Sequence, residues 1–266
     1  MVGIFSFLPS NHLRVRRAYT RCALIVLLMA PLVFILSASG GSGQPRTYTV
    51  SEAPDPNGLV YEGSNYGGWW YDANNIDANS VVYSFGLGED TSWDEALLRR
   101  GAHVFGFDPT PKSLEYVRRR EELKRGPGRF TLIPEGLWTS DTILKFTLPD
   151  DPKHVSLRAG EHQGKQGSIE LKVNTLEHFM NVNKHSRLDI LKIDVEGAEY
   201  EFLEDLLTKD FFPFDQLLVE FHHRFFEAGK DIQNDLFLKM FLRGFAVARN
   251  ENNQEVTFRK VFRTNK

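Results

Sequence analysis

From residue 80 onward, short apolar runs alternate with amphipathic segments, and this alternation limits the fold more than any other feature of the sequence. The apolar runs are 80–85, 103–108, 129–134, 188–194 and 216–221. Segments with helical character, including 91–101, 110–126 and 198–207, follow them along the chain. Short apolar runs bounded by turn residues indicate buried strands, and strands alternating with helices indicate a parallel sheet. The sequence therefore predicts an α/β fold with helices covering a parallel sheet.

Three segments do not follow this alternation. Residues 136–173 contain "ILKFTL" and "SIELKV" around a polar loop, which predicts a β-rich insertion at one edge of the sheet. Near the C-terminus, "GFAVAR" and "EVTFRKVF" are joined by the polar turn "NENNQ", which predicts a hairpin of two strands. Before the first strand, "GGWWY" (67–71) is interpreted either as a lid over a ligand or as a flap packed on the sheet.

The N-terminal part is predicted to lie outside the folded domain. Residues 1–22 form a basic tail, 23–38 an uncharged apolar run, and 39–57 a Gly-, Ser- and Pro-rich stalk before a domain at 58–266. The apolar run is slightly short for a transmembrane helix, which needs about 17–25 residues. Basic residues on its N-terminal side predict a single-pass signal anchor with the domain in the lumen of the ER or Golgi. Secretion after signal-peptide cleavage, or a mitochondrial presequence, is the alternative.

The overall composition restricts the function classes. The formal net charge is −3, whereas a general nucleic-acid-binding protein is usually basic. We therefore expect no nucleic-acid partner. A single cysteine, Cys22, excludes an intrachain disulfide and a cysteine-rich metal site.

The loop "SFGLGED" (84–90) predicts a nucleoside site. Gly86 and Gly88 allow close backbone approach, and the helix that follows offers unpaired N–H groups. About 20 residues on, Asp108 ends the next strand, where an acid can accept hydrogen bonds from ribose hydroxyls. The alternative is structural, with the glycines forming a tight turn and Asp108 capping the next helix.

The charge of this loop favours one kind of nucleoside. A dinucleotide site would carry a third glycine near Thr91, and instead Glu89 and Asp90 stand at the loop. Carboxylates there repel a pyrophosphate but suit an amino acid's ammonium group. S-adenosylmethionine has such a group and no phosphate, so the loop favours this methyl donor over NAD.

Several further stretches resemble one enzyme family. They are "YSFGLGEDTSWDEAL", "VFGFDPTP", "EGLW", "VNTLEHF", "LKIDVEGAEYEFL" and "LLVEFHH", which together span 83–223. In these stretches, the chain resembles the FkbM-type methyltransferases, which depend on S-adenosylmethionine. The resemblance implies a class I methyltransferase fold, Rossmann-like, with a seven-stranded, mostly parallel sheet ending in an antiparallel hairpin.

The resemblance also implies roles for individual residues. Gly86 and Gly88 would lie against the donor's methionine end, with Asp90 beside them, Asp108 on the ribose and Glu135 near the adenine. Two departures from the general class I pattern concern the first motif. Tyr83 and Ser84 replace the usual acid of the first strand, and Asp90 replaces the third glycine.

The strand ends supply the candidates for catalysis. Methyl transfer to oxygen needs alignment and removal of a proton, so a base is expected. The strand ends offer five possible bases, which are Asp194, Glu196, Glu220, His222 and His223. Histidine titrates nearest neutrality, so His222 is a reasonable base. The predicted catalytic residues are Asp194, Glu220 and His222. The same three residues could instead hold a divalent cation, which is not predicted. Glu196 and Glu199 are interpreted as acids of a helix N-terminus.

The predicted activity is methylation by S-adenosylmethionine, on a hydroxyl oxygen of a glycan, glycolipid or small metabolite. Two alternatives remain open. One is a catalytically inactive methyltransferase-like binding module, and the other is an NAD-dependent Rossmann dehydrogenase, which does not account for the C-terminal hairpin.

Overall fold

The computed structural model describes residues 58–147, 158–159, 167–226 and 229–261. The predicted basic tail (1–22), membrane segment (23–38) and stalk (39–57) lie outside these residues. Within the described ranges, no helix combines the length and the apolar character needed to cross a bilayer.

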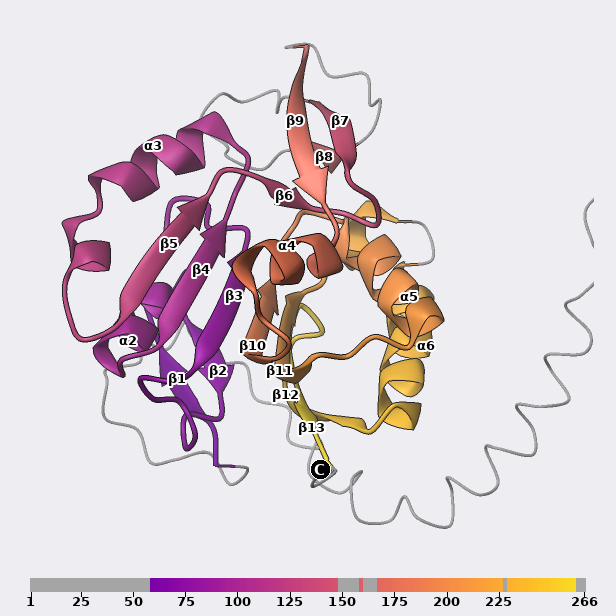
Figure 1. The fold of residues 1–266 in the computed structure, drawn as a ribbon. Helices are drawn as coiled ribbons and strands as arrows, with labels where there is room; N and C mark the ends of the chain where they lie inside the picture. The colour runs from indigo at the N-terminus through magenta and orange to yellow at the C-terminus, as the bar shows by residue number, and fades with distance from the viewer. Residues whose placement is uncertain (1–57, 148–157, 160–166, 227–228, 262–266) are drawn as a thin grey trace, which may run out of the picture. The chain divides into compact units, whose positions relative to one another are not determined.

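Seven strands form the central sheet in the order β12-β13-β11-β10-β3-β4-β5 (Figure 1). Their bounds are β3 Val81–Phe85, β4 His103–Phe107, β5 Arg129–Ile133, β10 Leu188–Ile193, β11 Phe214–Glu220, β12 Phe245–Glu251 and β13 Glu255–Lys260. Neighbours from β5 to β11 are parallel, and β13 is antiparallel to both β11 and β12. The predicted mostly parallel seven-stranded sheet with a C-terminal hairpin is confirmed.

Helices cover both faces of this sheet. They are α2 Ser92–Arg99, α3 Pro111–Arg119, α4 Leu176–Asn183, α5 Glu199–Lys209 and α6 Gly229–Leu242, with short 3-10 helices η2 Glu121–Lys124 and η3 His223–Phe225. Side chains alternate along each strand, so Val82 faces one layer while Tyr83 and Phe85 face the other. Val82 packs with α2 and α3, whereas Tyr83 and Phe85 pack with α4, α5 and α6.

The insertion predicted between residues 136 and 173 is also confirmed. It contains β6 Gly136–Leu137, β7 Thr142–Thr147, β8 Arg158–Ala159 and β9 Ser168–Asn174. These strands form a second sheet, in the order β6-β9-β7-β8, which rises at the top of Figure 1.

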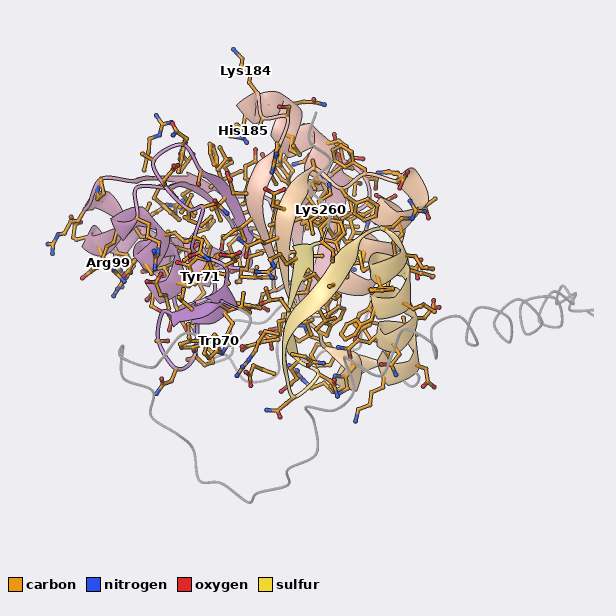
Figure 2. The ribbon with its side chains drawn as sticks, turned by 90° about the horizontal axis from the view of Figure 1, so that it is seen from below. Trp70, Tyr71, Arg99, Lys184, His185 and Lys260 are labelled. Atoms are coloured by element: carbon orange, nitrogen blue, oxygen red, sulfur yellow. The ribbon has the colours of Figure 1, made fainter. Side chains whose placement is uncertain are left out.

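A small hairpin that the sequence did not predict precedes β3. It pairs β1 Val60–Glu62 with β2 Trp69–Tyr71, on which Trp70 and Tyr71 are labelled in Figure 2. Trp69 and Tyr71 are buried, and the Thr257 hydroxyl donates to the Trp70 carbonyl at 2.6 Å. The packed-flap interpretation of "GGWWY" therefore describes β2, although Trp69 also lines the cavity described below.

Candidate active site

A cavity of about 570 Å³ lies at the carboxyl ends of β3, β4, β10 and β11. The segment before β2, the insertion and the turn between β12 and β13 complete its lining. Ligand sites commonly have volumes of about 300–1,000 Å³, and open parallel sheets bind ligands beyond the carboxyl ends of their strands. The cavity is therefore the candidate active site.

The cavity is strongly acidic. Among the described residues that line it, eight carry carboxylates and two carry cations. The acids are Glu89, Asp90, Asp94, Asp108, Asp194, Glu196, Glu220 and Glu255, and the cations are Lys192 and Arg224. A cavity of this sign repels phosphate groups and attracts cationic ones.

The predicted glycine loop is held by close backbone packing. Gly86 has a φ of +80°, and a Cβ atom there would lie 1.7 Å from the carbonyl oxygen of Asp194. No larger residue fits without moving one of the two strand ends. Gly86 and Gly88 both line the cavity, so the loop faces the cavity on one side and packs against the end of β10 on the other.

Asp108 is the anchor of this loop. One carboxylate oxygen accepts from the amides of Leu87 and Gly88 at 3.0 and 3.1 Å. The other accepts from the Thr110 amide and hydroxyl at 2.8 and 2.7 Å. Asp108 is 4% exposed and lines the cavity. These contacts fit the structural alternative, and the ribose role stays a prediction.

The two acids that were expected to meet an ammonium group already have protein partners. The Glu89 carboxylate lies 2.9 Å from the Lys112 ammonium. The Asp90 carboxylate accepts from the Ser64 hydroxyl at 2.5 Å and from the Ser92 amide at 2.8 Å. Burial alone would raise the pKa of Asp90, but these hydrogen bonds lower it. Asp90 thus ties the segment before β2 to the start of α2.

Glu135 is the predicted cofactor residue that does not line the cavity. Its carboxylate accepts from the Lys172 ammonium at 2.8 Å and from the Asn174 amide group. The residues that follow it, 136–138, do line the cavity. Any contact with the adenine at this strand end therefore comes more directly from 136–138 than from Glu135.

Lys192 connects the glycine loop to β10. Its ammonium donates to the Gly86 carbonyl at 2.5 Å and lies 3.6 Å from an Asp194 oxygen. The ammonium also lies 5.6 Å from the centre of the Trp69 ring, a cation–π distance. The alternation of side chains along the strand predicts that Lys192 shares a face with Asp194 or pairs with a neighbouring acid, and the contact with Asp194 fits both interpretations.

His222 is the catalytic candidate that does not line the cavity. Its Nε2 atom is 3.3 Å from Glu196, 3.6 Å from Glu220 and 3.9 Å from Asp194 carboxylate oxygens. Its Nδ1 atom is 3.2 Å from Glu199. Burial disfavours the charged imidazolium, yet the Glu199 hydrogen bond and the surrounding carboxylates raise the His222 pKa to about 9.

The acids after β10 do more than begin a helix. Glu199 lies in the first turn of α5, as predicted, but it is fully buried. Its carboxylate accepts from the His222 amide at 2.7 Å and from the Gly197 amide at 2.8 Å. Glu196 adopts a left-handed φ of +52°. The helix-terminus interpretation was therefore incomplete, because both acids also contact His222.

Glu220 and Glu255 lie opposite each other on β11 and β13. Both line the cavity. Burial, followed by the charge of Asp194, raises the pKa of each to about 7. Sequence analysis missed Glu255, although the predicted C-terminal hairpin contained the signal. Because β13 is antiparallel to β11, an acid at the start of β13 lies beside the residue that ends β11.

One group of side chains at this end could hold a cation. Asp194, Glu220 and His222 each offer a ligand atom, and these atoms lie within 4.8 Å of one another. Two carboxylates and an imidazole suit a divalent metal ion. The arrangement matches the three residues named from the sequence, while the presence of a metal remains untested.

Comparison with known proteins gives a family match. The family described as the methyltransferase FkbM domain matches residues 75–249. "Probable methyltransferase-like protein 24" of Homo sapiens is 27% identical over 143 residues, which are 53% of this chain and 32% of that protein. "Hexuronic acid methyltransferase AglP" of Haloferax volcanii is 26% identical over 142 residues, which are 50% of this chain and 56% of that protein.

The match covers only part of these relatives, since it spans 32% and 56% of their own lengths. Among solved structures, methyltransferase FkbM from Methylobacillus flagellatus is similar with a TM-score of 0.42 and 13% identity. That alignment covers 71% of this chain and 46% of the other.

Proposed function

Because the chain belongs to the FkbM methyltransferase family, we propose that it transfers a methyl group from S-adenosylmethionine to a hydroxyl oxygen. The observation that carries the proposal is the acidic cavity, in which Glu220 has a pKa of about 7 beside the strand ends. A glycan, glycolipid or small metabolite is the proposed acceptor.

The residues present fit the proposed donor. S-adenosylmethionine supplies an electrophilic methyl group on a positively charged sulfur. Eight lining carboxylates suit that charge and the donor's ammonium group, while they oppose the pyrophosphate of NAD. The 86–90 loop would hold the donor at the ends of β3 and β4, with Asp108 fixing the loop in place. The dehydrogenase alternative is correspondingly less well supported.

Glu220 is the proposed base. A base works best when its pKa lies near the working pH, and the pKa of Glu220 is about 7. His222, with a pKa raised to about 9, carries a proton at neutral pH and does not line the cavity. We therefore propose that His222 does not act as the base but positions the side chains of Glu220 and Asp194.

A divalent cation on Asp194, Glu220 and His222 is the alternative route to an activated hydroxyl. The expected result is that excess EDTA leaves the rate unchanged. A rate that falls in EDTA and returns with added Mg²⁺ or Mn²⁺ would assign the three residues to a metal instead.

The acceptor class is supported by one relative, whose name states that it methylates a hexuronic acid. The compartment is proposed from the sequence alone, with residues 23–38 as a membrane anchor and the domain in the lumen. Protease treatment of intact microsomes tests this arrangement, because a lumenal domain is protected until detergent is added.

The proposed function is tested by titrating the full-length protein with S-adenosylmethionine and, separately, with NAD. Binding of the first but not the second is expected. Donor labelled in its methyl group is then incubated with the protein and either uronic acid oligosaccharides or a cell extract. Label in a glycan or small molecule supports the proposal, whereas donor binding without any transfer would favour the inactive binding module.

A further inference from the structure

Asp94 is a buried acid that the proposed mechanism leaves unused. It lies on α2, is 3% exposed and lines the cavity. Its Oδ1 atom has no hydrogen-bond partner. An ionised oxygen without a partner is costly to bury, so such an atom in a cavity wall indicates a missing ligand group.

The unsatisfied atoms near the cavity are concentrated at one place. Six buried side-chain atoms in the described part of the chain lack a partner, and only those of Trp93 and Asp94 belong to lining residues. Trp93 offers an N–H donor and Asp94 offers an acceptor. An amino acid zwitterion presents the complementary pair, because its carboxylate accepts hydrogen bonds and its ammonium donates them.

The other acids at this end of the cavity already have protein partners. Glu89 is paired with a lysine, and Asp90 accepts from two protein donors. Asp108 accepts four hydrogen bonds from the loop and its own turn. A carboxylate has about four acceptor positions, so Asp108 is filled. Asp94 is the acid here with a buried oxygen that has no hydrogen-bond partner.

Asp94 also lies close to two side chains from the central sheet. Burial raises the pKa of Asp94 to about 6, while the charge of Lys192 on β10 and the hydroxyl of Ser84 on β3 oppose this shift. Ser84 is itself fully buried.

We propose that Asp94 binds the α-ammonium group at the amino acid end of the methyl donor. This assignment rests on the proposed function, because it requires S-adenosylmethionine as the ligand. An ammonium group donates a charge-assisted hydrogen bond to the unpaired oxygen and neutralises a buried charge. The 86–90 loop leads directly into α2, so one continuous segment contacts this end of the donor.

The test compares two ligands on one variant. Full-length protein carrying Asp94→Asn is titrated with S-adenosylmethionine and with 5′-methylthioadenosine, which lacks the amino acid end. The variant is expected to bind S-adenosylmethionine about 10- to 100-fold more weakly, the range of one charge-assisted hydrogen bond. Its affinity for 5′-methylthioadenosine is expected to stay within about twofold of the wild type, since the proposed contact is with the amino acid end, which this ligand lacks.

Glu95→Gln is the matched control. Glu95 is the next residue, is also buried, and contacts Thr91 and Arg120 without lining the cavity. The Glu95→Gln protein should keep the wild-type ratio of the two affinities. Equal losses for both ligands in the Asp94→Asn protein would overturn the proposal, because they would reflect a disturbed fold rather than a lost ammonium contact.

A second measurement needs no variant. Wild-type protein is titrated with S-adenosylhomocysteine and with its deaminated analogue, and the deaminated ligand is expected to bind at least about 10-fold more weakly. Equal binding of the two would overturn the Asp94 assignment while leaving the proposed function intact. If the wild type binds no adenosyl ligand at all, the proposed function fails and the assignment fails with it.

Discussion

The two ends of the cavity use the same kind of side chain in opposite ways. At the end formed by β3 and β4, Asp108 follows β4 and both of its oxygens are occupied by protein donors. At the end formed by β10 and β11, Glu220 lies among Asp194, Glu255 and a single imidazole. A strand-end carboxylate with enough donors becomes part of the framework. One that is buried beside other carboxylates has its pKa raised, first by burial and then by their charge, and it is then suited to proton transfer.

The largest expected effect comes from Glu220→Gln. Removing the base should lower kcat by about 10²- to 10⁴-fold, the usual contribution of general base catalysis. Because the change also removes a repelled charge, the melting temperature at pH 8 should not fall. Activity assays and thermal melts on the same preparation check both parts. A variant that keeps full kcat would show that Glu220 is not the base.

Asp108→Asn should produce the reverse pattern. The NH₂ group of the new amide cannot accept the hydrogen bonds that one carboxylate oxygen accepted. The free energy of unfolding should therefore fall by about 1.5–3 kcal/mol. Chemical denaturation measures this change. Glu115→Gln on α3, where the carboxylate is largely exposed, is the control and should alter stability little. Unchanged stability in the Asp108→Asn protein would contradict the structural role of Asp108, and with it the contrast with Glu220.

The pH dependence of stability sharpens the comparison at His222. The folded-state pKa of about 9 lies above the ordinary value of 6.5, so the stabilisation is fully present below pH 6.5 and is lost as the pH rises through 9. The slope can reach at most about 1.4 kcal/mol per pH unit for one proton. Denaturation curves from pH 6 to 10 measure this slope. In His222→Gln, the part of the slope due to this residue should disappear, and an identical slope would contradict the assigned pKa.

The smallest effect is expected from Glu255→Gln. The charge of Glu255 helps to raise the pKa of Glu220, so removing it should lower that pKa. The acidic limb of the rate profile should then move to lower pH by less than about one unit, with the rate above pH 8 nearly unchanged. Rates measured between pH 5 and 9 test this prediction. A shift of the acidic limb toward higher pH would contradict the proposed effect of Glu255 on the pKa of Glu220.

The regular part of the fold could be predicted because its signals are local. Each main strand is an apolar run bounded by turn residues, and the polar turn before β13 indicated the final hairpin. The β1–β2 hairpin was missed because its strands have three residues each. Such short strands depend on contacts with distant parts of the chain, including the bond from Thr257 to the Trp70 carbonyl.

The site could be predicted only in part, for the same reason. The sequence motifs predicted that Gly86, Asp194 and Glu220 lie at one site, and all three line the same cavity. It could not show that Ser64 engages Asp90, or that Lys112 engages Glu89, since these partners come from other segments. Nor could it show that Glu255 joins Glu220, which depends on the register of an antiparallel pair.

The position of Glu255 on β13 also determines the order in which the residues of the cavity are added during translation. A polypeptide leaving the ribosome contains the 86–90 loop and Asp108 long before residue 255 has been added. The residues whose hydrogen bonds join Asp108 to the loop are then all present, whereas the carboxylate pair lacks its second member. The nascent protein thus contains the complete anchor of the loop before it contains the complete pair of Glu220 and Glu255.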